Sequence, residues 1–272
     1  MRWMSLFLAM TMTMAVPLAA EEIAPAMLDA LPAADVVILG EVHDNPLHHI
    51  HQARAIAAIR PTAVVWEMLT TEQALNMPDD RRAPDDVSEA LGWEGTGWPA
   101  FTLYYPIVTA AGSARHFGAA VPRGQARGAF AEGAAAVFAG DAALFGLSDP
   151  LPDAEQSDRE QAQFEAHCAA MPIEMMGGMV EAQRLRDASL AQAAMLALAE
   201  TGGPVVVITG TGHARVDWGM PALLRRAEPD ARVVSVGQIE ASDASAVGGA
   251  LPYDVWIVTP PHPRNDPCDA FR

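Results

Sequence analysis

The sequence predicts an α/β fold, with a central and mostly parallel sheet flanked by helices and an inserted helical cover subdomain. Short runs of apolar residues, many of them β-branched, recur along the chain. These runs are continuous rather than alternating, which is typical of strands that are buried on both faces. Helical patterns lie between them, and strand–helix alternation favours parallel pairing through crossover helices. With 51% hydrophobic and 19% charged residues, the chain has the composition of a globular protein.

Six apolar runs are expected to form the strands of this sheet. In chain order they are Asp35–Leu39, Ala63–Trp66, His116–Ala120, Pro204–Thr209, Arg232–Val236 and Asp254–Val258. Two helices have recognisable ends. The helix Pro46–Ile59 is predicted to begin with proline, directly after the cap candidates Asp44 and Asn45. The helix Glu181–Glu200 is rich in Ala, Leu, Gln and Arg, and the glycines that follow it are typical of a helix end.

The middle of the chain has fewer strand signals. Residues 77–99 are rich in Asp, Gly and Trp, and residues 140–178 carry prolines and methionines. We expect helical insertions at about 70–112 and 140–180, which would cover one end of the sheet as a lid or second subdomain.

The first twenty residues have the layout of a cleavable signal peptide. Arg2 supplies a positive charge, an apolar run covers Leu6–Ala15, and small residues precede Glu21. We therefore expect residues 21–272 to form one mature domain that is periplasmic or secreted. No cysteine lies near the cleavage point, so we expect no lipid anchor there, and no later segment is predicted to span a membrane.

The charge balance excludes one large class of partner. The chain carries 17 basic and 34 acidic residues, for a net charge of −17, and every basic residue is an arginine. Nucleic-acid binding requires clustered positive charge, so the composition excludes it as a function. The same balance argues against docking on an anionic membrane surface.

The chain has two cysteines, Cys168 and Cys268. In an exported protein we expect them to pair, since the compartment is oxidising. The bridge would close a loop of about a hundred residues and would stabilise the fold by about 3–5 kcal/mol. The alternative is two unpaired thiols, because spacing along the chain does not show proximity.

Two glycine turns that end in histidine follow predicted strands. The first, GEVH, presents Glu41 and His43, and the second, GTGH, presents His213. Glu67 directly follows a third strand. Ligands of open α/β sheets bind outside the carboxyl ends of the strands, so we expect these side chains to converge on one site.

Several segments together carry a resemblance to a known family. They are VVILGEVHDNPLHHIHQARAI, VVWEM, AQRLRDASLAQ, VVVITGTGHARVDWGMPALL and DVWIVTPPHPRNDPC. The chain resembles the ChaN-type haem-binding uptake family of the Tiki superfamily, related to TraB and erythromycin-esterase-like proteins. It departs from that pattern in lacking a lipobox cysteine and in carrying Ala120 near a position where similar sequences have asparagine. The resemblance implies an α/β protein of iron uptake, with a shared site of Glu41, His43, Glu67, Asp187 and His213.

The resemblance also implies haem as the ligand. Haem needs an iron ligand, an apolar slot and partners for two propionates. We expect haem contacts from Tyr104, Tyr105, His49, Arg123 and Arg184, with a tyrosinate as one candidate iron ligand; the alternative for each tyrosine is packing in the core. The covalent haem motif Cys-x-x-Cys-His is absent, so the haem would be held non-covalently. An outer-membrane haem receptor or another transport component, and a second copy of the chain, are the expected partners.

The same side chains also permit a second interpretation, a metal-dependent hydrolase of the protease or esterase type. His43 and His213, with Glu41 or Glu67, would hold a divalent metal such as zinc and leave one position for water. Neither an HExxH helix nor a GxSxG turn is present. We therefore prefer a binding protein and keep the hydrolase as the alternative.

Overall fold

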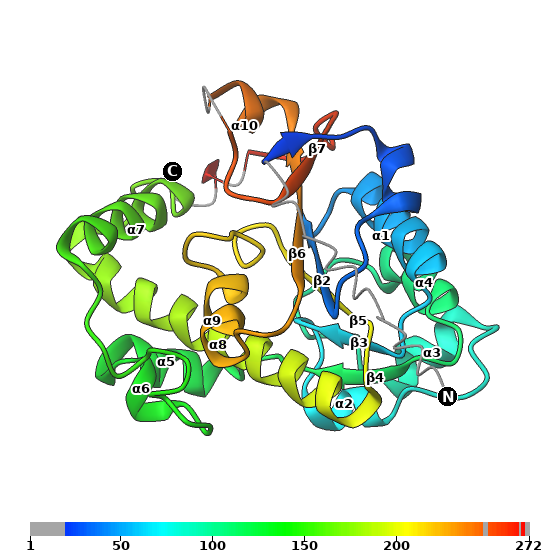
Figure 1. Ribbon diagram of the computed structural model, residues 1–272. Coiled ribbons are helices and arrows are strands. Elements are labelled where there is room, and N and C mark those ends of the chain that lie inside the picture. The colour runs from blue at the N-terminus through cyan, green and yellow to red at the C-terminus, as the bar shows by residue number, and fades with distance from the viewer. Residues whose placement is uncertain (1–19, 247–249, 267, 270–272) are drawn as a thin grey trace, which may run out of the picture.

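The computed structural model describes residues 20–246, 250–266 and 268–269. Residues 1–19 of the predicted signal peptide therefore lie outside the described part. The described chain forms one sheet of seven strands in the order β1-β7-β6-β2-β5-β3-β4, and every neighbouring pair is parallel (Figure 1). The strands are β1 (Glu21–Glu22), β2 (Val36–Glu41), β3 (Ala63–Trp66), β4 (Arg115–Gly118), β5 (Val205–Gly210), β6 (Val233–Glu240) and β7 (Val255–Thr259).

The predicted α/β class and its parallel sheet are confirmed. Each of the six predicted strands is present with small shifts at its ends. Strand β2 shows why these runs are continuous: Val36 and Ile38 pack into one core cluster, while Val37 and Leu39 pack into a second cluster on the other face. Helices cover both faces, so alternate residues of a central strand meet apolar partners on either side.

The helices divide between these two faces. They are η1 (Pro25–Ala30), α1 (Pro46–Ile59), α2 (Thr71–Leu75), α3 (Pro84–Ala90), α4 (Phe101–Ala110), α5 (Arg123–Glu132), α6 (Ala134–Val137), α7 (Asp153–Ala166), η2 (Ile173–Met175), α8 (Met176–Thr201), α9 (Met220–Ala227) and α10 (Ala241–Ala246). Residues of η1 and α1–α4 contribute to one core cluster, and residues of α5, α6, α8 and α9 contribute to the other. Figure 1 shows the sheet between these two layers.

Helix α1 has the predicted bounds, and its start follows from its cap. The Asn45 side chain accepts a hydrogen bond from the Leu47 amide at 3.0 Å, and Pro46 occupies the first turn. Helix α8 begins five residues before the predicted Glu181 and runs for 26 residues to a left-handed Gly202, whose φ is 77°. Its long buried face brings Asp187 to the carboxyl edge of the sheet, beside His213.

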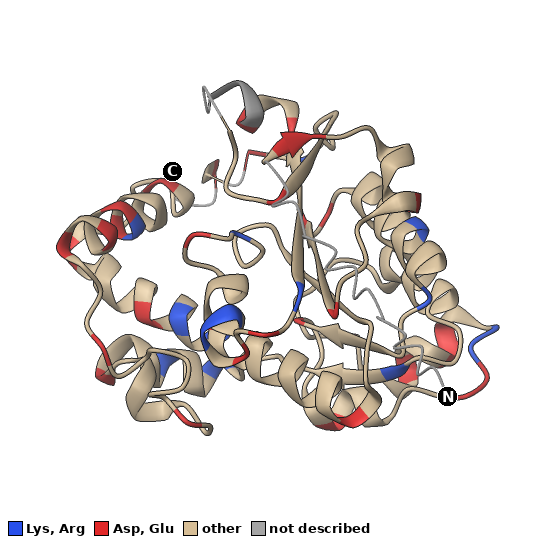
Figure 2. Ribbon diagram, in the orientation of Figure 1, with Lys and Arg blue, Asp and Glu red and all other residues tan. Residues whose placement is uncertain are grey.

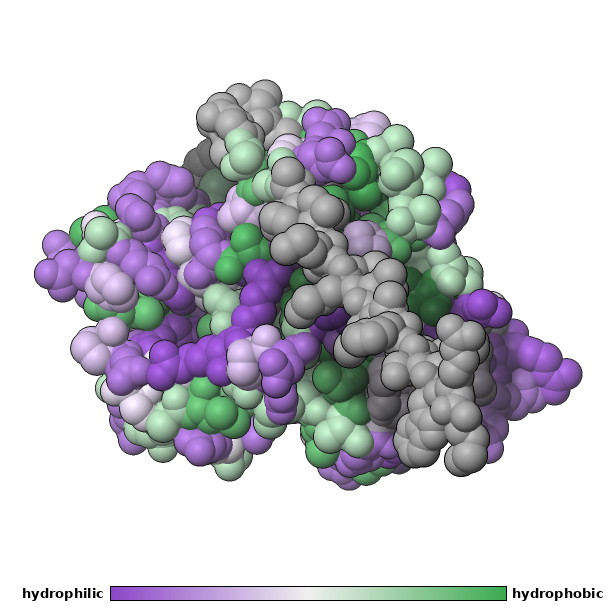
Figure 3. All heavy atoms as spheres, in the orientation of Figure 1, coloured by the Kyte–Doolittle hydropathy of each residue, from purple (hydrophilic) through white to green (hydrophobic). Residues whose placement is uncertain are grey.

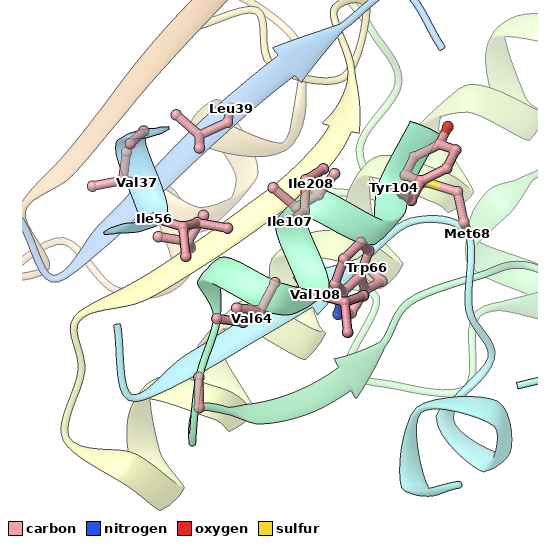
Figure 4. Packing of buried hydrophobic residues seen from close by; sticks show 14 of the residues in the cluster. Val37, Leu39, Ile56, Val64, Trp66, Met68, Tyr104, Ile107, Val108 and Ile208 are labelled. Carbon is pink, nitrogen blue, oxygen red and sulfur yellow. The ribbon is translucent and has the colours of Figure 1, made fainter. Parts of the chain in front are cut away.

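Figure 4 shows the packing of the first core cluster, on the face that α1 and α4 cover. The largest buried side chains there include Trp66 and Tyr104. The Trp66 indole donates to His116 Nδ1 at 2.8 Å, so its one polar atom is satisfied inside the core. Burial lowers the pKa of His116 to about 3, which keeps this imidazole neutral and able to accept that hydrogen bond.

Cys168 and Cys268 form a disulfide, with their Cα atoms 5.5 Å apart. Cys168 follows the end of α7, and Cys268 lies in the C-terminal tail, so the bridge joins this helix to the end of the chain. The sequence left open a disulfide or two unpaired thiols, and the structure shows the disulfide. Within the described residues, no helix combines the length and the apolar character that crossing a membrane requires.

Candidate functional site

The carboxyl ends of three adjacent strands, β2, β5 and β3, bring the predicted polar residues together. Glu41 ends β2, Glu67 directly follows β3, and Gly210 ends β5. A Cβ atom on Gly210 would lie 2.8 Å from His43 Nε2 and 3.6 Å from Glu67 Oε2, so only glycine permits this close approach. The two glycine turns of the sequence therefore meet at one site, as predicted.

Glu41 is the buried anchor of the first half of the site. Its Oε1 accepts hydrogen bonds from the Tyr104 hydroxyl at 2.8 Å and from His43 Nδ1 at 2.7 Å. His49 Nδ1 lies 3.4 Å from the other carboxylate oxygen, and His49 Nε2 donates to the His43 carbonyl at 2.9 Å. The Glu41 contact orients His43 and leaves its Nε2 free of protein hydrogen bonds among the described residues. The His43 side chain is 32% exposed, whereas the residues that hold it are buried.

Glu67, His213 and Asp187 form the second half. Glu67 Oε2 accepts from the Thr209 hydroxyl at 2.8 Å and from the Gly210 amide at 2.7 Å, while its Oε1 lies 3.6 Å from His213 Nε2. His213 Nδ1 donates to Asp187 Oδ1 at 2.7 Å. The imidazole therefore lies between two buried carboxylates.

These contacts set the charge of His213. Burial alone would lower the pKa of His213, but the negative charges of Glu67 and Asp187 raise it to about 9. Burial raises the pKa of Glu67, yet the positive charges of His213 and His43 outweigh it and hold this pKa below its ordinary value. His213 is therefore an imidazolium at neutral pH.

The raised pKa of His213 predicts a loss of stability at alkaline pH. The folded protein holds this proton more tightly than the unfolded chain, so the stabilisation is complete below about pH 6.5 and is lost as the pH rises to about 9. The loss would reach about 3 kcal/mol. Urea unfolding at about pH 6 and about pH 9 measures it. In Asp187→Asn the dependence is expected to shrink, because one of the two carboxylates that hold the proton is gone; equal dependence in both proteins would contradict this origin.

Two cavities adjoin this buried group, one at Glu67 and the other at Asp187 and His213. The first has a volume of about 270 Å³ and is lined by Glu67, Trp98, Arg123, Arg186 and Leu190, with parts of the 119–121 loop. The Trp98 ring lies 4.8 Å from the His43 ring, centroid to centroid. The second has a volume of about 240 Å³ and lies between α7, α8 and the loop after β5. We call them the Trp98 cavity and the α7 cavity.

The Trp98 cavity holds two arginines that are not committed to carboxylates. Ten of the described arginines form ion pairs. Arg123 and Arg186 form none with the described residues, and Arg186 makes only long hydrogen bonds, of 3.3 and 3.4 Å, along its own helix. In a protein of net charge −17, two such guanidinium groups in one cavity point to an anionic ligand.

The structure places the other predicted haem contacts away from both cavities. Tyr104 is 0% exposed, and burial raises the pKa of its hydroxyl far above the ordinary value. Figure 4 shows its ring among the residues of the first core cluster. The Tyr105 hydroxyl donates to the carbonyls of Arg81 and Arg82, and Arg184 binds Glu181 and backbone carbonyls. In this arrangement Tyr104 and His49 position His43, and Arg184 holds the 146–149 loop. Direct haem contacts from these residues stay a prediction.

Sequence reasoning missed one residue that fixes the site. Arg264 in the C-terminal tail donates to both oxygens of Asp44, at 2.7 and 2.8 Å, and to Glu240. These hydrogen bonds hold the pKa of Glu240 at about 2. They fix the loop that follows His43 from a position 220 residues further along the chain, a separation that no spacing rule would detect.

The donor set does not support the metal-centred alternative. Among the described residues, no group of three or more His, Cys, Asp or Glu side chains is arranged to hold a metal ion. His213 already donates to Asp187, and its other nitrogen faces Glu67. The predicted pair of His43 and His213 thus finds no third ligand in the described part of the chain.

The fold and the site together define a class: an α/β protein with a ligand site at the carboxyl edge of a parallel sheet, built from two histidine–carboxylate groups and an arginine-lined cavity. The model of the haem-binding uptake family ChaN, of the Tiki superfamily, matches residues 27–224, and the chain belongs to this family. A solved structure of ChaN from Campylobacter jejuni, described for its cofacial haem binding, has a similar fold with a TM-score of 0.59. The two sequences are 19% identical, and the match covers 78% of this chain and 84% of that one. No curated protein sequence matches the chain.

Proposed function

We propose that the protein binds haem non-covalently at the Trp98 cavity and carries it in iron uptake. The observation that carries the proposal is the arrangement of His43, Trp98, Arg123 and Arg186 on one side of the buried site. Membership of a haem-binding uptake family supports the ligand. The iron of bound haem is the cargo, and the protein supplies its ligand and its surroundings.

The residues present fit the three needs of haem. His43 is oriented by Glu41 through Nδ1, which leaves Nε2 as the nitrogen for iron. Trp98 and Leu190 supply apolar surface. Arg123 and Arg186 are the partners for the propionates, because neither guanidinium is already paired with a carboxylate of the described chain.

The size of the cavity indicates how the haem lies. Pockets that enclose a drug-sized ligand measure about 300–1,000 Å³. The Trp98 cavity, at about 270 Å³, is smaller, so we infer that part of the porphyrin projects from the protein. Cofacial haem binding in the Campylobacter jejuni protein supports such a partly exposed ligand. A second copy of the chain is the partner we propose for the projecting face.

Haemin titration of the protein tests the iron ligand. We expect a shifted Soret band that saturates at one haem per chain, and a different spectrum in His43→Ala, because the oriented imidazole is gone. His51→Ala is the matched control, since His51 lies in α1, directly after the His43 turn, but binds Gln238. If wild type shows no shift at micromolar haemin, the proposed function fails. If His51→Ala changes the spectrum and His43→Ala does not, the ligand assignment fails.

The propionate partners are tested by the double variant Arg123→Gln/Arg186→Gln. Removing hydrogen bonds to a charged group is expected to weaken haemin binding about tenfold or more. Arg127→Gln is the control, because Arg127 lies one turn further along α5 and does not line the cavity. Dissociation constants from haemin titrations measure the difference, and equal affinities in the double variant and wild type would rule out this placement of the propionates.

We also propose that the chain is exported by the signal peptide at 1–20 and acts in the periplasm or outside the cell. The Cys168–Cys268 disulfide supports an oxidising compartment. An outer-membrane haem receptor or another transport component is the partner that this location favours.

A further inference from the structure

The α7 cavity shares no lining residue with the Trp98 cavity, and the proposed haem site does not use it. Its volume is about 240 Å³. Its walls come from α7, α8 and the loop after β5. Its lining consists of Arg159, Ala162, Gln163, Ala166, Val180, Gln183, Asp187, Gly212, His213, Arg215 and Trp218.

Positive charge dominates the lining of this cavity. Arg159, Arg215 and His213 face it with one carboxylate, Asp187, which is bonded to His213. The carboxylates that pair with the two arginines, Glu155 and Asp217, do not line it. The positive charge of this lining is opposite in sign to the net charge of the protein, which is −17. Helix α7 itself carries acidic residues on its outer side (Figure 2).

The remaining lining is apolar and aromatic. Val180, Ala162, Ala166 and the Trp218 ring provide it, and the guanidinium of Arg215 lies 3.7 Å from the centroid of that ring. The surface around α7, at the left of Figure 3, is mostly hydrophilic.

Two polar atoms of the lining residues are left without partners. Arg159 is only 8% exposed, and its Nε is a buried donor with no hydrogen-bond acceptor among the described residues. Gln163, one turn further along α7, has a buried Oε1 with no donor in the same part of the chain. Buried polar atoms are nearly always satisfied in native proteins, so the unsatisfied Arg159 donor indicates a ligand that accepts hydrogen bonds, whereas such a ligand does not satisfy the Gln163 acceptor.

We propose that the α7 cavity is a second ligand site, which binds a small organic carboxylate with an apolar body. The carboxylate meets Arg159 and Arg215, and the apolar part lies against Val180 and Trp218. Since each water occupies about 30 Å³ of liquid, the cavity holds a molecule the size of about eight waters, far smaller than haem.

Isothermal titration of the purified protein with benzoate tests the site. Benzoate is expected to bind saturably at about millimolar concentration or below, and benzamide, its neutral analogue of similar shape, at least about tenfold more weakly. Arg215→Gln is expected to weaken benzoate binding about tenfold or more, because it removes one cation from the partly exposed rim. Arg232→Gln is the matched control, since Arg232 pairs with Asp35 at the opposite end of the sheet.

Two further experiments test whether the benzoate binds in this cavity. Ala166→Trp should fill the cavity from its exposed rim and abolish binding, while Ala154→Trp on the same helix should not.

A carboxylate in this cavity could also be a haem propionate, so the titration is repeated with haemin-saturated protein. Unchanged benzoate affinity supports a separate site, whereas competition by haemin assigns the cavity to haem and overturns the proposal. Absence of benzoate binding up to about 10 mM, or equal binding in Arg215→Gln, also overturns it. Apart from the competition with haemin, each of these results is independent of whether haemin binds at His43.

Discussion

Glu67→Ala is expected to lower the free energy of unfolding by about 3–5 kcal/mol. The substitution leaves the Thr209 hydroxyl and the Gly210 amide without their acceptor, and it removes one of the two carboxylates around the buried imidazolium of His213. A buried charge and two buried donors would then be unsatisfied, which costs more than the methylene groups that are lost. Urea unfolding at neutral pH, followed by circular dichroism, measures the change.

Two variants separate this effect from a general loss of charge. Glu67→Gln keeps an acceptor for Thr209 and Gly210 but removes the negative charge, so it should cost less than Glu67→Ala and should lower the pKa of His213, which NMR titration can follow. Glu200→Ala removes a surface carboxylate that pairs with Arg115 and is expected to cost at most about 1 kcal/mol. A cost for Glu67→Ala as small as that of Glu200→Ala would show that the network does not stabilise the fold.

The double variant Cys168→Ser/Cys268→Ser is expected to lose about 4–5 kcal/mol of stability. The bridge spans 100 residues, and in the loop-entropy model a closed loop of about this size restricts the unfolded chain by that amount. Thermal and urea unfolding of wild type and variant, both without reductant, measure the difference. Wild type in reductant should approach the stability of the variant.

Arg226→Gln is a matched control for the disulfide pair. It breaks a surface ion pair with Asp149 that leaves the chain connectivity unchanged, and it should alter stability by at most about 1 kcal/mol. An oxidised wild type no more stable than the double serine variant would mean that the native state gains nothing from the bridge.

The sheet could be predicted from the sequence because its signals are local. A run such as Val205–Gly210 is long, continuous and bounded by turn residues, and central parallel strands require such a pattern. The two-residue strand β1 was missed, since Glu21 and Glu22 are polar and pair with β7 only at the edge of the sheet. Helix α7 lies within the helical insertion predicted at about 140–180, but its position depends on packing against α8 and on the disulfide.

The site was predicted in part for the same reason. Glu41, His43, Glu67 and His213 directly follow strands, and the carboxyl ends of parallel strands meet at one edge. Which side of α4 faces inward cannot be read from a helix that is apolar almost all round, so the burial of Tyr104 behind Glu41 was not evident. Asp187 was expected at the site, but its partner, His213, could not be predicted, because the packing of α8 against β5 brings the two side chains together.

The Arg264 contacts have a consequence for the order in which the protein is assembled. Arg264 lies 220 residues after Asp44 along the chain, and β1 pairs with β7, so distant segments must meet before the His43 turn and this edge of the sheet take their final form. Contacts between distant residues form slowly, because a long loop must close before they are made. The final geometry of the site is therefore expected to form late in folding.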